Sequence, residues 1–316
     1  IRKYGPSPHL HSSGVTMTWR VLDFTSFRGR LSYARGRIKA EYHDGSRKTV
    51  SLAEVAIVTV ANNVDISSGL LGVLGEKSIP VIVTDWRKIP LATSTGWSTH
   101  TRVGARQIAQ ANLSLPRRKQ AWASLVRAKV RSQAQTLQAL GLSTASNNLH
   151  KLALEVRSGD PANVEAQAAR LYWRHFSNES FHRNQDGIDF VNIALNYGYT
   201  VLRGHCIRAV TEAGLWPALG VFHHSRSNGF NLADDLIEPF RPVIDYSVAQ
   251  LPPDSEIEDP AVRTALVSAS TAPFHKDGRS VTTMLSATAQ QFGRYAEGEI
   301  KQFHAESWSG PLQEAA

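Results

Sequence analysis

The pattern of apolar and polar positions changes character near residue 95. Residues 17–95 contain short runs of β-branched and aromatic residues. Residues 31–45 alternate apolar and polar side chains, with the turn signals Arg35-Gly36 inside this stretch and Asp44-Gly45 at its end. Residues 55–60 and 79–84 are short apolar runs of the kind that suits a buried strand. These features predict a small β-sandwich-like domain over residues 17–95.

Between the last two runs, residues 67–78 read SSGLLGVLGEKS. A phosphate-binding loop is not predicted, because that motif needs Gly-Lys-Ser/Thr and here Glu76 separates Gly75 from Lys77. Gly69, Gly72 and Gly75 recur every three residues. We therefore expect a short helix whose small face packs closely on the sheet.

From residue 102 onward the apolar residues have helical spacing. Helices are expected over residues 102–113, 116–140, 147–156, from 160 onward, 188–213, 262–270 and 280–304. Gly141 is expected to end the second helix, and Asp160 and Pro161 to be the N-cap and first residue of the fourth. The predicted fold class is α+β, with the small β-sandwich-like domain followed by a larger all-α domain at residues 103–304.

The remaining segments carry no strong pattern. Residues 1–16 are expected to be a disordered or non-native extension. Residues 96–102 are polar and are expected to link the two domains, and residues 305–316 are expected to form a flexible tail.

The composition excludes several classes of protein. The chain has 316 residues, 42% of them hydrophobic, and no apolar run approaches the ~20 residues of a membrane helix. The first residues lack an apolar centre, so no signal peptide is expected. The one cysteine, Cys206, rules out an internal disulfide framework and fits a cytoplasmic protein, in which we expect it to be a small buried hydrophobe.

The positive charge is concentrated in one part of the chain. The net charge is +8, and residues 86–154 contain eleven Lys and Arg but no Asp or Glu. DNA phosphate is the expected counter-charge, and the alternative is a basic face that only keeps the protein soluble. The candidate DNA-binding residues are Arg102, Arg106, Arg117, Arg118, Lys119, Arg127, Arg131 and, further along the chain, Arg226.

Residues 220–242 combine two histidines with the three acids Asp234, Asp235 and Glu238. The acids lie among apolar residues at helical spacing, namely Leu232, Leu236 and Phe240. Like charges beside a core are costly unless a cation or a proton offsets them. A divalent metal with His223 as a further ligand would do so. The alternative is an acidic helix that faces solvent and pairs with Arg241.

Glu165 is a second unusual acid. Its neighbours on a helix are small and apolar, and none of them can pair with a charge. We expect Glu165 to face inward, toward a positive group from elsewhere, which on the alternative interpretation is a distant arginine. Tyr172, Tyr197 and Tyr199 occur at helical positions nearby, where core packing is favoured over a role in the site.

Three motifs occur in order along the chain: EAQAARLYW, NYGYTVLRG and GVFHHSRSNGFNLADDLIEPFRP. Together they resemble the CRISPR-associated integrase family, the larger of the two universal spacer-acquisition proteins, and most closely the branch that accompanies type II systems. The resemblance covers roughly residues 17–304. It implies a β-rich start, a helical remainder and an endonuclease or integrase activity on DNA.

The resemblance also implies a metal site that holds Mg²⁺ or Mn²⁺. Its ligands would be Glu165, His223 and Glu238, with Asp235 as a supporting acid, and the Gly-x-x-His spacing favours His223 over His224. These residue types suit a hard divalent cation. In the implied reaction, the 3′-hydroxyl of captured DNA attacks a phosphodiester in the CRISPR repeat, and no nucleoside triphosphate is needed.

The implied partners are double-stranded DNA, both spacer precursor and repeat, and a second copy of the chain bound through the β-rich domain. Two such homodimers would be bridged by the small universal adaptation protein, and a contact with the effector nuclease is left open. Two other functions compete with integration. One is a stand-alone metal-dependent nuclease acting on branched DNA. The other is an architectural DNA-binding protein whose acidic cluster only holds the fold together.

Overall fold

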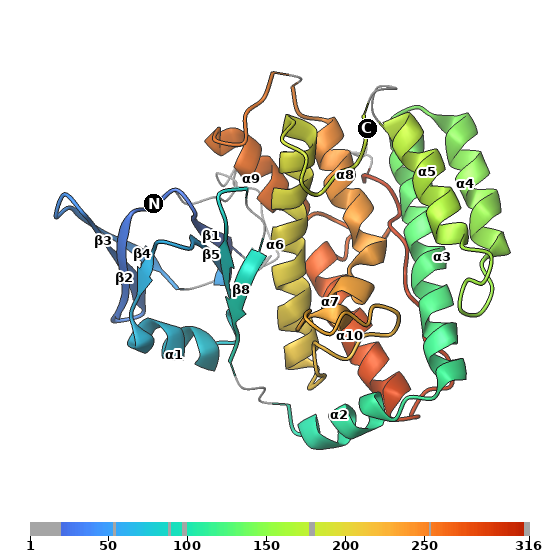
Figure 1. Ribbon diagram of the computed structural model, residues 1–316, viewed down its shortest axis with the longest axis horizontal. Helices are drawn as coiled ribbons and strands as arrows, with labels where there is room; N and C mark the ends of the chain where they lie inside the picture. Colours follow the sequence, from blue (N-terminus) through green and yellow to red (C-terminus); the bar gives the residue numbers. More distant parts are fainter. Residues whose placement is uncertain are drawn as a thin grey trace.

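The structure is a computed structural model that describes residues 20–52, 55–87, 90–96, 100–176, 181–252 and 254–312. The expected extension at residues 1–16 and part of the expected linker, residues 97–99, lie outside the described residues. A β-rich part lies beside a larger helical part, and α6 runs along the boundary between them (Figure 1). The α+β class and the order of the two parts are therefore confirmed.

The strands form two sheets of four. They are β1 (Arg20–Phe24), β2 (Gly29–Ala34), β3 (Arg37–Tyr42), β4 (Arg47–Ser51), β5 (Val55–Ala61), β6 (Asp65–Ile66), β7 (Val81–Thr84) and β8 (Pro90–Ser94). The first sheet has the order β1-β5-β7-β8, in which β1, β5 and β7 are parallel and β8 is antiparallel to β7. The second has the order β4-β3-β2-β6, in which β2 pairs antiparallel with β3 and β3 with β4, while β6 is parallel to β2.

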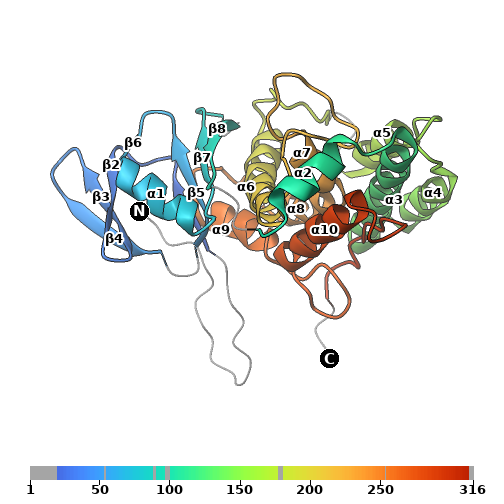
Figure 2. The same cartoon turned by 90° about the horizontal axis from the view of Figure 1, so that it is seen from below.

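The strands β1, β5 and β7 of the first sheet are buried on both faces, which explains why β5 reads as an unbroken apolar run. One face carries Leu22 and Val58, which belong to a core shared with the second sheet. The other face carries Val21, Ile57 and Ile82, which join the helical core. Figure 2 shows this arrangement, with the second sheet on the side away from α6 and α9.

The helix α1 (Ser68–Glu76) was expected, but of its predicted small face only Gly75 is closely packed, since a Cβ there would lie 3.3 Å from Cα of Gly96. A Cβ placed on Gly69 or Gly72 would meet nothing within 4 Å, so these glycines do not pack on the sheet. Leu70 and Leu74, spaced i and i+4, are the buried residues. The leucine spacing, rather than the glycine spacing, sets the inner face because burying leucine removes far more apolar surface from water.

The helical part consists of α2 (Val103–Ala111), α3 (Leu115–Ala139), α4 (Ser143–Glu155), α5 (Val164–Phe176), α6 (Phe190–Glu212), α7 (Asn231–Leu236), the 3₁₀ turn η1 (Glu238–Phe240), α8 (Arg241–Ala249), α9 (Pro260–Ala269) and α10 (Val281–Ala296). Gly141 has φ +81°, which fits the end of α3. Among these described helices, none is long and apolar enough to cross a lipid bilayer.

Two glycines of the NYGYTVLRG motif let α6 approach its neighbours closely. A Cβ on Gly204 would lie 2.7 Å from Cδ1 of Ile82 and 2.9 Å from Cδ1 of Ile57, both in the first sheet. A Cβ on Gly198 would lie 2.4 Å from Cγ2 of Ile244 in α8. The motif therefore wedges α6 between the sheet and the helices that carry the candidate site.

A buried polar cluster joins the two parts. Asp23 of β1 accepts hydrogen bonds from the hydroxyls of Thr59 and Tyr197, each at 3.2 Å. The guanidinium of Arg263 in α9 lies 3.3 Å from the same carboxylate. The strand β1 and the helices α6 and α9 are thus joined through the buried carboxylate of Asp23.

Two predicted boundaries are wrong. The helix α5 starts at Val164, not at Pro161, although the Asp160 carboxylate still accepts from the N–H groups of Val164 and Glu165 at 2.9 Å. The helix α10 ends at Ala296, where Gly298 adopts φ +82° and turns the chain.

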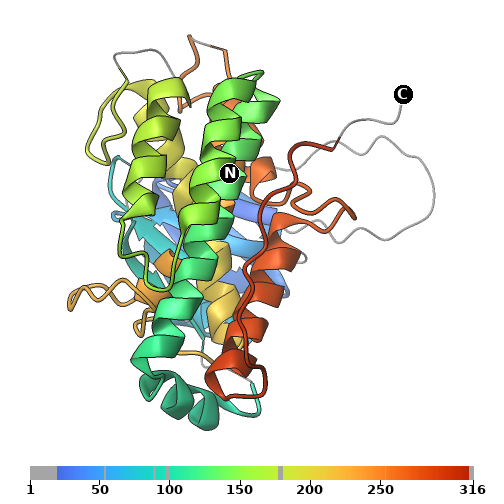
Figure 3. The same ribbon diagram turned by 90° about the vertical axis from the view of Figure 1, so that its right-hand side faces the viewer.

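The expected flexible tail is wrong for the described residues 305–312. Trp308 is 3% exposed, and its backbone N–H donates to the hydroxyl of Ser132 in α3 at 2.9 Å. The backbone N–H of Ala305 likewise donates to the hydroxyl of Ser124, which precedes Ser132 on α3. Figure 3 shows this segment running along α3. Serines inside a helix offer no pattern that would predict a chain segment packed beside them.

Candidate functional site

The loop that begins at Gly220 folds around the carboxylate of Asp235. Three successive backbone N–H groups, those of Val221, Phe222 and His223, donate to Asp235 at 2.5, 3.0 and 3.2 Å. Asp235 belongs to α7 and is fully buried. A Cβ on Gly220 would lie 2.3 Å from the carbonyl oxygen of His223 and 2.9 Å from Oδ2 of Asp235. The Gly-x-x-His spacing is therefore the spacing of a turn that wraps an acid.

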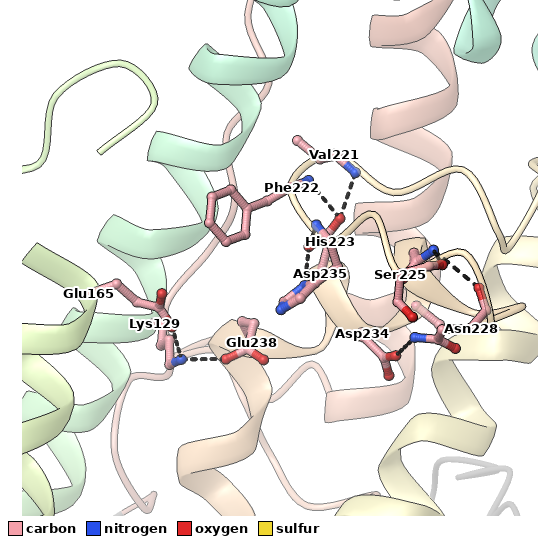
Figure 4. A network of polar contacts seen from close by, with 12 residues as sticks. Lys129, Glu165, Val221, Phe222, His223, Ser225, Asn228, Asp234, Asp235 and Glu238 are labelled. Atoms are coloured by element: carbon pink, nitrogen blue, oxygen red, sulfur yellow. Dashed lines mark hydrogen bonds and ion pairs between the residues drawn. The ribbon is translucent and has the colours of Figure 1, made fainter. Parts of the chain in front are cut away.

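The same acid orients the imidazole of His223. Nδ1 of His223 lies 2.6 Å from Oδ1 of Asp235, and the hydrogen bond to Asp235 raises the pKa of His223. With Nδ1 held by the carboxylate, the ring presents Nε2 to the other side, where Figure 4 shows it pointing toward Glu238. His224 is exposed and lines a different hollow, with Arg118 and Arg226. The geometry thus favours His223, as the spacing did.

Glu165 and Glu238 converge on one cation, the ammonium of Lys129 in α3. Nζ of Lys129 lies 2.6 Å from Glu165 and 2.5 Å from Glu238 (Figure 4). Glu238 also pairs with Arg241 at 2.9 Å. Burial alone would raise the pKa of Glu238, but the charges of Arg241 and Lys129 lower it to about 2. The two acids come from α5 and η1, which are far apart in sequence.

The buried helix decides between the two interpretations of the acidic stretch. Leu232, Leu236 and Phe240 are at most 1% exposed, and Glu238 is 6% exposed. An acidic helix facing solvent is therefore wrong, although the pairing of Glu238 with Arg241 that it assumed does occur. Pro239 lies in the 3₁₀ turn that separates α7 from α8.

Glu165 faces inward as expected, and its positive partner is a lysine rather than an arginine. Among the described residues, no three of the His, Cys, Asp and Glu side chains are grouped closely enough to hold a metal as they stand. The reason is visible at Lys129, whose ammonium lies between the two carboxylates. Two carboxylates around one cation, with a preoriented imidazole beside them, form a donor set that fits Mg²⁺ or Mn²⁺.

A polar cavity of about 380 Å³ opens beside His223 and Glu238. Three arginines that were not predicted as site residues line it: Arg183, Arg203 and Arg241. Two of them lie over the ring of Tyr199, and Arg203 pairs with Asp234 at 2.7 Å. Arg203 and Arg241 belong to the quoted motifs, which is the signal that could have identified them. The cavity can accept an anion next to the carboxylate–histidine cluster.

The basic stretch is partly neutralised by acids from other elements. Arg106 is 5% exposed and bonds to Glu297, Gln290 and the carbonyl of Ala213, so its assignment as a DNA-binding residue is wrong. Arg102 pairs with the same glutamate, Glu297, at 2.7 Å.

The other candidates differ in how freely their charge faces solvent. Arg117 lies over the ring of Tyr295 and donates to two backbone carbonyls, and Arg127 and Arg118 are half-buried and each donate to one. Lys119, Arg131 and Arg226 are exposed.

The aromatic and cysteine expectations mostly hold. Tyr172 and Tyr197 are buried in the core, while Tyr199 is 9% exposed and also lines the cavity. Cys206 is buried and donates to the carbonyl of Ala233 at 3.4 Å. Phe222, next to His223, stacks on Trp122 with ring centroids 4.1 Å apart.

Fold and site together define an α+β protein with a carboxylate–histidine cluster beside an arginine-lined cavity. The family model described as CRISPR associated protein Cas1 matches residues 24–265. The chain is 39% identical over 236 residues to the CRISPR-associated endonuclease Cas1 of Neisseria meningitidis serogroup C (strain 8013), which covers 74% of this chain and 76% of the relative. The chain therefore belongs to the Cas1 family, as its three motifs predicted.

Other proteins are similar to this chain in sequence or in fold alone. A CRISPR-associated endonuclease Cas1 of Pyrobaculum aerophilum is 27% identical over 288 residues, or 85% of this chain and 96% of the relative. A casposase bound to integration product is similar in fold, with a TM-score of 0.75, 18% identity and coverage of 93% of this chain and 94% of that one. A Cas1 protein from Thermotoga maritima has a TM-score of 0.73 at 19% identity, over 91% of this chain and 100% of that one.

Proposed function

We propose that this chain joins the 3′-hydroxyl ends of captured DNA to a CRISPR repeat by phosphodiester transesterification. Glu165, His223 and Glu238 are the proposed ligands of Mg²⁺ or Mn²⁺. The observation that carries this proposal is the convergence of Glu165 and Glu238 on a single cation, beside a histidine whose other ring nitrogen is fixed by Asp235. The motif order and membership of the Cas1 family support the same assignment.

The residues divide the work of the reaction. A divalent metal bound there supplies polarisation of the phosphodiester and positive charge for its oxygens. Asp235 holds Nδ1 of His223 and so keeps Nε2 available as a ligand. Arg183, Arg203 and Arg241 provide positive charge in the adjoining cavity for DNA phosphates.

The reaction exchanges one phosphodiester for another. The attacking 3′-oxygen forms a bond to phosphorus and loses its proton, while the bond from phosphorus to the leaving 3′-oxygen of the repeat strand breaks and that oxygen takes up a proton. Because bonds of the same kind form and break, no nucleoside triphosphate is required.

We also propose partners for this chain. A Cas6-RT-Cas1–Cas2 complex is similar in fold, with a TM-score of 0.73 and 19% identity over 96% of this chain and 37% of that one. This supports a small adaptation protein that bridges two homodimers of this chain. The assignment to the type II-like branch rests on the motifs.

The direct test is a half-site integration assay with Mn²⁺, a repeat duplex and a DNA with free 3′ ends, with and without the small partner. Glu165→Ala and His223→Ala should each abolish joining while DNA binding is largely retained. Joining that survives both substitutions would overturn the proposal. Cleavage of branched DNA without strand transfer would favour the stand-alone nuclease instead.

A further inference from the structure

We propose that Lys129 is the resident cation of the metal site, and that a divalent metal enters by exchange with its ammonium. This inference rests on the proposed function, because it takes Glu165 and Glu238 as metal ligands. Nζ of Lys129 lies 2.6 Å from one carboxylate and 2.5 Å from the other, and its side chain is 13% exposed.

The position of the ammonium is not that of an ordinary ion pair. Each carboxylate comes from a different element, α5 or η1, and α3 supplies the lysine that bridges them. Glu238 already has Arg241 as a counter-charge at 2.9 Å, so it does not need Lys129 for neutralisation alone. The bridge brings Glu165 to Glu238, and those are the two acids that a metal would have to bring together.

The bridge has two opposing effects on metal binding. It keeps two carboxylates close together without a metal, which two unpaired like charges would resist. It also competes with the metal, because a divalent ion and an ammonium repel each other strongly in a partly buried site. Loss of the lysine charge should therefore make the site bind metal more tightly while making the metal-free protein less stable.

The first test is calorimetric titration of the full chain with Mn²⁺. Lys129→Met keeps a long side chain without charge, and Lys129→Arg keeps the charge. Lys129→Met should bind Mn²⁺ at least about tenfold more tightly than the unaltered chain, and Lys129→Arg no more tightly. The melting temperature of metal-free Lys129→Met should be lower and should rise more on addition of Mn²⁺. Equal Mn²⁺ affinities for a folded Lys129→Met and the unaltered chain would overturn the exchange.

A second measurement needs no variant. Acetylation of the unaltered chain, followed by mass spectrometry, reports how accessible each lysine is. Saturating Mn²⁺ should increase the acetylation rate of Lys129 several-fold, because its ammonium leaves the carboxylates. Lys119, which is exposed on the same helix, is the matched control and should not change. An unchanged rate at Lys129 with Mn²⁺ bound would overturn the inference even if Lys129→Met failed to fold.

The outcomes also separate this inference from the proposed function. If Glu165→Ala and His223→Ala bind Mn²⁺ as tightly as the unaltered chain does, the proposed metal site is wrong and the proposed exchange is wrong with it. If binding depends on both but Lys129→Met binds no more tightly, the site stands and only the exchange fails.

Discussion

Nδ1 of His223 lies 2.6 Å from Oδ1 of Asp235, and the carboxylate that holds it is fully buried. Each oxygen of Asp235 accepts two hydrogen bonds. Oδ2 accepts from the N–H groups of Val221 and Phe222, and Oδ1 accepts from the N–H group and the imidazole of His223. The histidine and its loop are thus positioned by one side chain.

Replacement of Asp235 by asparagine should weaken the hydrogen bonds that hold His223 and its loop. Donors surround both oxygens of Asp235, so the side-chain NH₂ of the asparagine would face N–H donors in either orientation. Each buried donor left without an acceptor costs about 1–3 kcal/mol. Metal-dependent joining should fall roughly 10–100-fold, which is typical of losing the partner of a ligating histidine. The rate of half-site joining at saturating DNA measures this. Asp277→Asn is a matched control, because Asp277 pairs with His275 at 2.9 Å on the surface. Equal effects of the two substitutions would contradict the prediction.

Gly220→Ala should damage the site more than the fold. The added Cβ would lie 2.3 Å from the carbonyl oxygen of His223, so the turn must shift and the three N–H groups must leave Asp235. We expect joining to fall at least about tenfold, as misplacement of catalytic groups commonly causes. Gly229→Ala is the control in the same loop, because a Cβ there meets nothing within 4 Å. Comparable joining by the two variants would show that the turn tolerates the extra atom.

Asp245 predicts a pH dependence of stability. Its carboxylate accepts from the hydroxyls of Tyr172 and Tyr199, with the charges of Arg183 and Arg241 also acting on it. Burial raises the pKa of Asp245 to about 6 from an ordinary 3.8. The folded chain therefore holds this proton to higher pH than the unfolded chain does. The stability it contributes is fully present below about pH 4 and is lost as pH rises through about 6.

Asp245→Asn should remove this loss, because an amide does not ionise. Its free energy of unfolding relative to the unaltered chain should increase by about 3 kcal/mol between pH 4 and pH 7, which corresponds to a shift of about two units. Urea unfolding at both pH values measures the difference. Asp254→Asn, at an exposed position, should show no such gain. A difference that does not vary with pH would contradict the assignment.

The basic residues should separate into two groups on substitution. Arg131→Ala and Arg226→Ala should each weaken DNA binding and lower the slope of log K against log salt by about one, with little effect on stability. Arg106→Ala should instead lower the free energy of unfolding by about 3 kcal/mol, because Arg106 is buried against Glu297. Fluorescence anisotropy over a salt series and thermal denaturation distinguish the two outcomes. A loss of DNA affinity in a fully stable Arg106→Ala would overturn this division.

The sequence predicted most of the fold because strands and helices were marked by strong local periodicity. It also named Glu165, His223, Asp235 and Glu238 as candidate site residues, since ordered motifs relate residues that are distant in the chain. Lys129 could not be found in that way. It lies in a stretch of many positive charges, and nothing local distinguishes a lysine that pairs with buried acids from one that faces solvent.

The errors have similar physical causes. Arg106 was assigned to DNA because its buried partner, Glu297, is 191 residues away along the chain. Gly69 and Gly72 were placed on the inner face of α1 because glycine spacing alone does not say which face is buried. Trp308 was placed in a flexible tail because its packing depends on Ser132 in another helix. In each case a contact between distant segments overrode a local pattern.

The tight contacts of α6 leave little room for the helix to move relative to the first sheet and α8. Gly204 meets the first sheet and Gly198 meets α8, each without room for one more carbon atom, and Cys206 bonds to Ala233 in α7. The helix α7 carries Asp235, which positions His223. A displacement of the sheet would therefore pass through α6 to the imidazole. Any assembly that binds the β-rich part would therefore also fix the position of the candidate site.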